Sequence, residues 1–125
     1  MRESILTDRV VSQKQLNFEK MMETRNKNRT FSEILKEEPL VLVDFFTIWC
    51  GPCKMLKPIL EELHTRAGDD VKILKVDVDK NPKAANKYQI RGVPTLMLFK
   101  YGKEVWTQSG VMSVAALQEV INKFK

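Results

Sequence analysis

The chain has 125 residues, of which 43% are hydrophobic and 30% charged, so it is long enough for one domain with a sizeable core. The net charge of +5 is mild and scattered, and without a basic cluster we expect no nucleic-acid binding. No apolar stretch approaches the ~20 residues that cross a bilayer, and charges interrupt Met1–Val11, so we expect neither membrane insertion nor a signal peptide. The expected compartment is the cytoplasm, although a periplasmic or secreted domain whose leader had been removed would look the same.

Residues 1–29 are polar and predict an N-terminal extension, either a docked helix or a flexible arm. Residues 30–125 are the predicted domain. Thr30 and Glu33 have the spacing of a capping box, so a short helix should begin there and end before Pro39.

The run Leu40–Phe46 is almost continuously apolar, which is typical of a central strand covered on both faces. A helix is expected from about Pro52 to Ala67, with Met55, Leu60 and neighbouring apolar residues on its buried face. The next strand, Val71–Val78, should then lie parallel to the first, because a strand, helix and strand form a crossover unit.

A short helix is expected from Pro82 to about Tyr88. Strands at Thr95–Lys100 and Lys103–Gln108 should pair antiparallel around a tight turn. Ser113 should cap a final helix that ends at Phe124. Together these elements predict an α/β fold with a mixed sheet of four to five strands and helices on both faces.

The two cysteines, Cys50 and Cys53, are the only ones in the chain, and they lie where the first strand meets the long helix. Two thiols at this junction can close and reopen a small disulfide ring. Unpaired N–H groups and the helix dipole favour a thiolate there. Cys50, at the exposed mouth of the turn, should attack, and Cys53, one turn inward, should resolve the mixed disulfide.

Two other uses of the cysteines fit the sequence less well. A zinc site usually needs four ligands, whereas the chain offers two cysteines and one histidine, His64. A purely structural disulfide would constrain little of the unfolded chain across a two-residue gap. No metal is therefore expected.

The motif Trp49–Lys54, with the block Tyr88–Thr95 and further ordered blocks, resembles the thioredoxin family over roughly residues 30–125. The resemblance implies a thioredoxin fold and a redox-active disulfide, Cys50–Cys53, with no bound cofactor. Members of this family have a thiol pKa near ~7 and a potential near ~−270 mV.

The resemblance also implies roles for other residues. Asp44 would relay a proton to and from Cys53, with a pKa raised by desolvation, and Lys75 would be its partner. From the residues alone, Asp44 could instead lie near solvent at a strand end, and Lys75 could be an ordinary exposed strand residue. Pro94 would be a cis-proline facing the cysteines, although a trans proline can also begin a strand.

A substrate-binding rim around the reactive sulfur is implied as well. Trp49 could instead be ordinary surface packing. The implied rim consists of Trp49, Gly51, Pro52, Val78, Gly92, Val93, Pro94, Gly110 and Val111.

The chain departs from the family pattern at Phe46-Thr47-Ile48, where Trp-Ala-Glu or a similar run is common. This departure bears on partner choice. Asp77 and Asp79, which alternate along a strand, are expected to be solvated carboxylates.

The predicted function is thiol–disulfide exchange that reduces protein disulfides. The expected partners are disulfide-containing proteins and an external donor, by analogy a flavin-dependent thioredoxin reductase, and the chain is expected to be a monomer. The alternatives are a disulfide oxidase or isomerase in an oxidising compartment and a non-catalytic binding subunit.

Overall fold

The computed structural model describes residues 29–125. The prediction that the N-terminal extension is a docked helix or a flexible arm concerns residues that lie almost entirely outside the described part of the chain. The described elements follow one another in this order: α2 (Phe31–Glu37), β1 (Leu40–Phe46), α3 (Gly51–Ala67), the 3-10 helix η1 (Gly68–Asp70), β2 (Lys72–Asp77), α4 (Pro82–Lys87), β3 (Thr95–Lys100), β4 (Lys103–Ser109) and α5 (Val114–Phe124).

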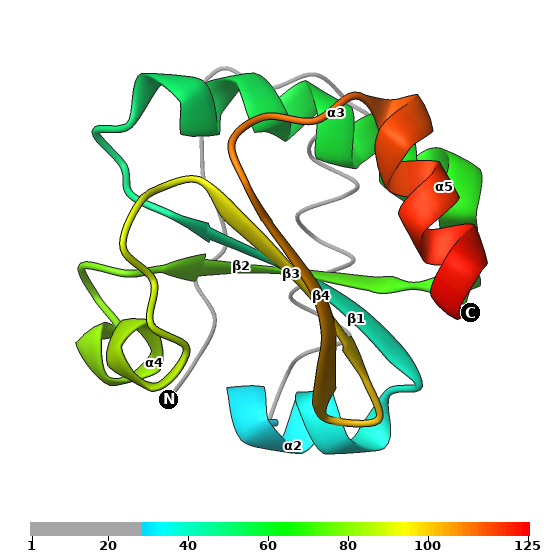
Figure 1. The fold of residues 1–125 in the computed structure, drawn as a ribbon, viewed down its shortest axis with the longest axis horizontal. Helices are drawn as coiled ribbons and strands as arrows, with labels where there is room; N and C mark the ends of the chain where they lie inside the picture. The colour runs from blue at the N-terminus through cyan, green and yellow to red at the C-terminus, as the bar shows by residue number, and fades with distance from the viewer. Residues whose placement is uncertain (1–28) are drawn as a thin grey trace.

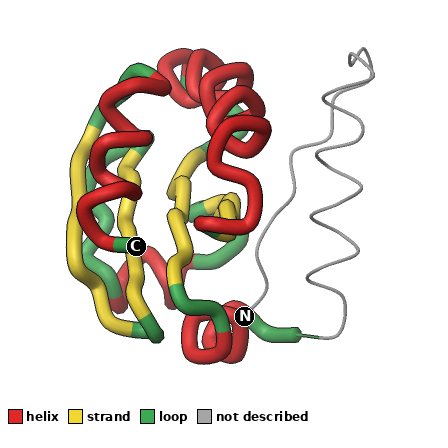
Figure 2. The backbone as a smooth tube through the Cα atoms, turned by 90° about the vertical axis from the view of Figure 1, so that its right-hand side faces the viewer, coloured by secondary structure: helices red, strands yellow, loops and turns green. Residues whose placement is uncertain are grey.

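The four described strands form one mixed sheet in the order β2-β1-β3-β4. Strand β1 pairs parallel with β2 and antiparallel with β3, and β3 pairs antiparallel with β4. Helices α3 and α5 lie on one side of this sheet, and α2 and α4 lie on the other (Figure 1). In the view turned by 90°, helices lie above and below the strands (Figure 2). The predicted mixed α/β architecture is therefore confirmed.

The predicted N-terminal caps of α2 and α5 form as expected. Thr30 Oγ1 accepts a hydrogen bond of 3.1 Å from the Glu33 N–H, and the Glu33 side chain accepts one from the Thr30 N–H, which completes the capping box. Ser113 Oγ likewise accepts from the Ala116 N–H at the start of α5. These bonds satisfy N–H groups that a helix leaves without partners in its first turn.

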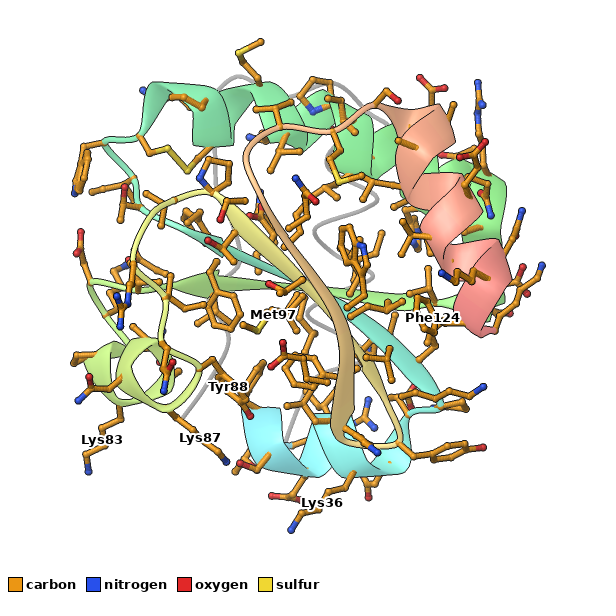
Figure 3. The ribbon with its side chains drawn as sticks, in the orientation of Figure 1. Lys36, Lys83, Lys87, Tyr88, Met97 and Phe124 are labelled. Atoms are coloured by element: carbon orange, nitrogen blue, oxygen red, sulfur yellow. A yellow bond between two sulfur atoms is a disulfide. The ribbon has the colours of Figure 1, made fainter. Side chains whose placement is uncertain are left out.

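Strand β1 is the centre of the core, because all seven of its residues are buried. On one side its Phe45 packs with an aromatic group that also contains Phe31, Tyr88 and Phe99. The ring centroids of Tyr88 and Phe99 lie 5.3 Å apart, and those of Tyr88 and Phe31 lie 6.2 Å apart. Figure 3 shows Tyr88 between the end of α4 and helix α2. The group thus fixes α2 and α4 against the same face of the sheet.

Two residues of the β3–β4 hairpin turn have positive φ, Tyr101 at 48° and Gly102 at 84°. These angles are those of a type I′ turn, whose twist matches the strands on either side. One prediction about α3 is wrong: Met55, expected on the buried face, is 62% exposed. Among the described residues, no helix combines the length and apolar character that a membrane span requires.

Candidate active site

The two cysteines lie at the N-terminus of α3, immediately after the turn that follows β1. They form a disulfide across a sequence separation of 3. Cys50 is the N-cap residue of the helix, and its Sγ accepts a hydrogen bond of 3.1 Å from the Cys53 N–H. No acidic residue lies in the first turn, so the positive end of the helix dipole faces the sulfurs without a competing carboxylate. This arrangement stabilises negative charge on Cys50.

The exposed position expected for Cys50 is wrong for the disulfide form. Cys50 is only 5% exposed and Cys53 is 4% exposed. Both pack in a small apolar cluster with Phe46, and the half-buried Val93 lies against that cluster. The difference between the two cysteines is therefore their place in the helix rather than their exposure: Cys50 caps it, and Cys53 lies within its first turn.

Asp44 interrupts the apolar sequence of β1 and is fully buried. In the sheet it is the register partner of Lys75 on β2, and Lys75 Nζ lies 3.7 Å from Asp44 Oδ2. Lys75 is itself only 5% exposed. The alternative readings, of an aspartate near solvent and an exposed lysine, are thus wrong.

Burial raises the pKa of the Asp44 carboxyl to about 6, because desolvation disfavours the charged form, while the Lys75 ammonium acts in the opposite direction. Within the described part of the chain, neither Asp44 oxygen has a hydrogen-bond partner, and 3.7 Å is too long for a strong hydrogen bond. The pair is therefore an electrostatic contact that leaves a carboxylate oxygen able to take up a proton.

The loop before β3 brings a proline to the cysteine cluster. The Val93–Pro94 peptide is cis, as the family resemblance implies, and the Val93 side chain packs against the cysteine cluster. The Gly110 N–H donates a hydrogen bond of 2.9 Å to the Pro94 carbonyl. Gly110 therefore meets the segment 93–94, whose Val93 contacts the cysteine cluster.

The other residues expected to form the rim are mostly exposed. Trp49 is 71% exposed and Val111 is 38% exposed, and Gly51, Pro52 and Gly92 are also exposed, whereas Val78 is half-buried. The Val78 N–H donates to the Phe46 carbonyl at 2.9 Å, which ties the end of β2 to the strand that leads into the cysteines.

Two contacts near the site were not singled out by the sequence. The Trp49 Nε1–H donates a hydrogen bond of 2.9 Å to Asp79 Oδ2. Phe46, noted only as a departure from the family pattern, contacts the cysteine cluster, and its ring centroid lies 5.3 Å from Lys75 Nζ. Trp49 and Asp79 are about 30 residues apart, and so are Phe46 and Lys75. No local sequence pattern could therefore have revealed these two contacts.

The expectation that Asp77 is solvated is wrong. Asp77 is 2% exposed, and its Oδ1 accepts from the Asp79 N–H at 2.9 Å and from the Lys80 N–H at 3.4 Å. Its carboxylate therefore holds the turn after β2, from which Asp79 reaches Trp49. Within residues 29–125, no group of three or more His, Cys, Asp or Glu side chains is arranged to hold a metal ion.

A disulfide closed across the first turn of a helix, with a buried carboxyl on the strand that leads into it and a cis-proline loop beside it, is the arrangement of a thiol–disulfide oxidoreductase. The sequence model of the thioredoxin family matches residues 20–123. The chain therefore belongs to the thioredoxin family, and it is a protein-disulfide reductase of that type.

Named relatives and solved structures agree with this membership. Thioredoxin from Bacillus subtilis is 50% identical over 86 residues, which cover 69% of this chain and 83% of the relative. Thioredoxin from Rickettsia prowazekii is 46% identical over 92 residues, which cover 74% and 88%.

Among solved structures, a single-residue mutant of thioredoxin from Halobacterium salinarum is 39% identical with a TM-score of 0.69, covering 74% of this chain and 80% of that one. Oxidised mitochondrial thioredoxin 3 from Saccharomyces cerevisiae is 33% identical with a TM-score of 0.68, covering 74% and 86%. The fold is thus the thioredoxin fold.

Proposed function

We propose that Cys50 is the nucleophile and Cys53 the resolving residue in the reduction of protein disulfides. The Cys50 thiolate attacks one sulfur of the substrate disulfide, forms a mixed disulfide and displaces the first substrate thiolate, which then takes a proton from water. The observation that carries this assignment is the position of Cys50 as the N-cap of α3, where its sulfur accepts the Cys53 N–H.

In the second step, the Cys53 thiol transfers its proton to the Asp44 carboxylate. The new Cys53 thiolate attacks Cys50, the Cys50–Cys53 disulfide forms, and the second substrate thiolate leaves. Two electrons thus pass from the chain to the substrate. A carboxyl with a pKa of about 6 suits this transfer, since a catalytic base works best when its pKa lies near the working pH. Lys75, at 3.7 Å, tunes that carboxyl.

The substrate segment binds across the rim described above. Its extended backbone pairs with the Val93 backbone beside the cis bond, while apolar side chains of the rim shield the mixed disulfide from water. Val93 packs against the cysteine cluster, and the exposed indole of Trp49 is held by Asp79, which supports this placement. The rim residues are Trp49, Gly51, Pro52, Val78, Gly92, Val93, Pro94, Gly110 and Val111.

The oxidised chain is reduced again by a reductase, which the thioredoxin family implies. The finer proposal is a flavin-dependent thioredoxin reductase acting on a monomer in the cytoplasm. Residues 30–125 form the catalytic domain in this proposal, and residues 1–29 are an extension to it.

The sharpest test of the roles is trapping with Cys53→Ser. This variant should hold substrates as mixed disulfides on Cys50 that dithiothreitol releases, and a Cys50→Ser control, which keeps Cys53, should hold none. Mixed disulfides trapped on Cys53 in the control at the same yield would refute Cys50 as the nucleophile. Identifying the trapped proteins would also name the substrates and their compartment.

Two measurements separate the alternatives. An equilibrium potential near that of the protein disulfide isomerases, about −180 mV against glutathione, would favour the oxidase or isomerase reading. A non-catalytic binding subunit should leave insulin-disulfide reduction by dithiothreitol at its background rate, whereas the reductase should accelerate it and lose that effect on Cys50→Ser.

A further inference from the structure

Phe46 lies at the end of β1, between the cysteine pair and the buried ion pair. It is 3% exposed and clusters with Cys50 and Cys53. Phe46 and Asp44 are two residues apart on β1, so their side chains lie on the same face of the sheet. Two groups therefore lie close to the Lys75 ammonium, with Asp44 Oδ2 at 3.7 Å and the Phe46 ring centroid at 5.3 Å.

We propose that Phe46 is a positioning residue for the resolving step, whose ring holds the Lys75 ammonium beside Asp44 while it covers the cysteine pair. This inference rests on the proposed role of Asp44 as proton acceptor for Cys53. The departure from the family pattern at position 46 keeps this contact, since a benzene ring still offers Lys75 a π face.

The physical basis is the cost of burying an ammonium group. Lys75 is almost fully buried, and a buried charge is stable only when other groups replace its lost hydration. The Asp44 contact is too long for a strong hydrogen bond. An aromatic ring within ~6 Å attracts a cation through its quadrupole, and more strongly where water is excluded. The ring thus adds support for the ammonium charge that lowers the pKa of Asp44.

Within residues 29–125, other charged and titratable groups near this ion pair are few. On β2, Asp77 lies on the same face as Lys75, but its Oδ1 accepts two backbone N–H groups. On β3, the register partner of Asp44 is the apolar Leu96. Helix α3 contributes Cys53, which titrates once reduced, and the half-buried Lys57 one turn further on.

Two substitutions of Phe46 distinguish the effect of the π face of the ring from the effect of its apolar volume. Phe46→Leu keeps an apolar side chain but removes the π face, so the ammonium loses a support and the pKa of Asp44 should rise. Because the ring attracts the ammonium in both protonation states of Asp44, the pKa of Asp44 rises only through the displacement of Lys75 from the carboxyl, and we expect a rise of about half to one pH unit. Phe46→Trp keeps an aromatic face and should leave the pKa of Asp44 unchanged.

The test is a double-mutant cycle on the oxidised protein, read by the pH titration of the Asp44 carboxyl carbon in NMR, with Asp44→Asn to identify the signal. Phe46→Leu should shift the midpoint upward when Lys75 is present and leave it unchanged in a Lys75→Met background. A shift of zero, a downward shift, an equal shift in both backgrounds or the same shift in Phe46→Trp would overturn the inference. If Phe46→Leu is unfolded by circular dichroism, Phe46→Met replaces it in the same cycle.

This titration needs no turnover, so it separates the contact from the proposed role of Asp44. The role is read in a second measurement, the pH dependence of Cys53 attack on a preformed mixed disulfide at Cys50. Phe46→Leu should move the midpoint of the acidic limb of that profile to higher pH by the same half to one unit, about as in the titration. A shifted titration with an unshifted rate profile would leave the contact intact and refute Asp44 as the proton acceptor, and with it the positioning role of Phe46.

Discussion

The indole of Trp49 is tied to Asp79 by a hydrogen bond of 2.9 Å between Nε1 and Oδ2, across 30 residues of sequence. Trp49 is 71% exposed, so this bond, rather than burial, fixes the orientation of the ring next to Cys50. Asp79 is itself placed by the buried carboxylate of Asp77, which accepts its N–H. Asp77 and Asp79 together thus position the large apolar side chain of Trp49 beside the disulfide.

We expect Asp79→Ala to release the Trp49 ring and to lower kcat/KM for a protein disulfide about two- to fivefold, since one hydrogen bond contributes about 1 kcal/mol. Insulin-disulfide turnover at several substrate concentrations measures this effect. Asp79→Asn keeps an acceptor oxygen and should stay near the parent value. If Asn is as impaired as Ala, the carboxylate charge matters rather than the bond.

The stability of the oxidised protein should decrease as the pH rises from about 4 to 7, in a way that depends on Asp44. Its pKa is about 6 in the folded chain against ~3.9 in the unfolded chain. The folded state therefore binds the proton more tightly, and the stability contribution present at low pH is lost as the pH rises through 6. Linkage places this loss at about 2 kcal/mol.

Guanidinium unfolding of the oxidised protein at a series of pH values measures that slope. Asp44→Asn cannot titrate, so the difference between the parent and this variant isolates the carboxyl from all other groups. Parallel stability curves over pH 4 to 7 would show that the pKa of Asp44 is not raised by folding.

Gln89 occupies a position that favours glycine. Its φ is 53°, and it follows α4 in a Schellman arrangement, with the Ile90 N–H bonded to the Ala85 carbonyl and the Gln89 N–H to the Asn86 carbonyl. Gln89→Gly should stabilise the protein by about 1 kcal/mol, because the left-handed conformation is costly for a residue with a Cβ. Gln89→Ala removes the exposed side chain but keeps Cβ, so in thermal unfolding it should show no such gain.

The capping box of α2 offers a test in a region remote from the disulfide. Thr30→Ala removes the acceptor of the Glu33 N–H and should lower the free energy of unfolding by about 1 kcal/mol. Thr30→Ser keeps the hydroxyl and should restore most of it. Activity per folded molecule should be the same in both variants, and a parallel loss of activity would contradict a purely local effect.

The sequence predicted the elements well wherever one local signal dominated. The apolar run of β1, the capping box at Thr30 and the serine cap of α5 depend on neighbouring residues alone, and each element lies where these signals indicate. Met55 shows the limit of periodicity. It fits the apolar stripe of α3 by spacing, but the buried face of the helix runs through Cys53, Leu56 and Leu60, and the Met55 side chain stays exposed.

The sequence was enough to predict the two cysteines of the site, but not all of the residues that surround them. Asp44 could be noticed because a carboxylate within an apolar run must be explained, whereas Lys75 looks like any strand lysine until the register places it opposite Asp44. The cis form of Val93–Pro94 has no local signature and was implied only by the family. The contacts of Trp49 with Asp79 and of Lys75 with Phe46 depend on how β1 and β2 meet, which is tertiary information.

The disulfide described above joins two residues of a single helical turn, three positions apart. Opening such a short ring frees almost none of the conformational entropy that a long cross-link would hold in the unfolded chain. The sheet and its helices are held by their own core, so both redox forms can keep one architecture. The chain can therefore gain and lose an electron pair through many cycles without refolding between them.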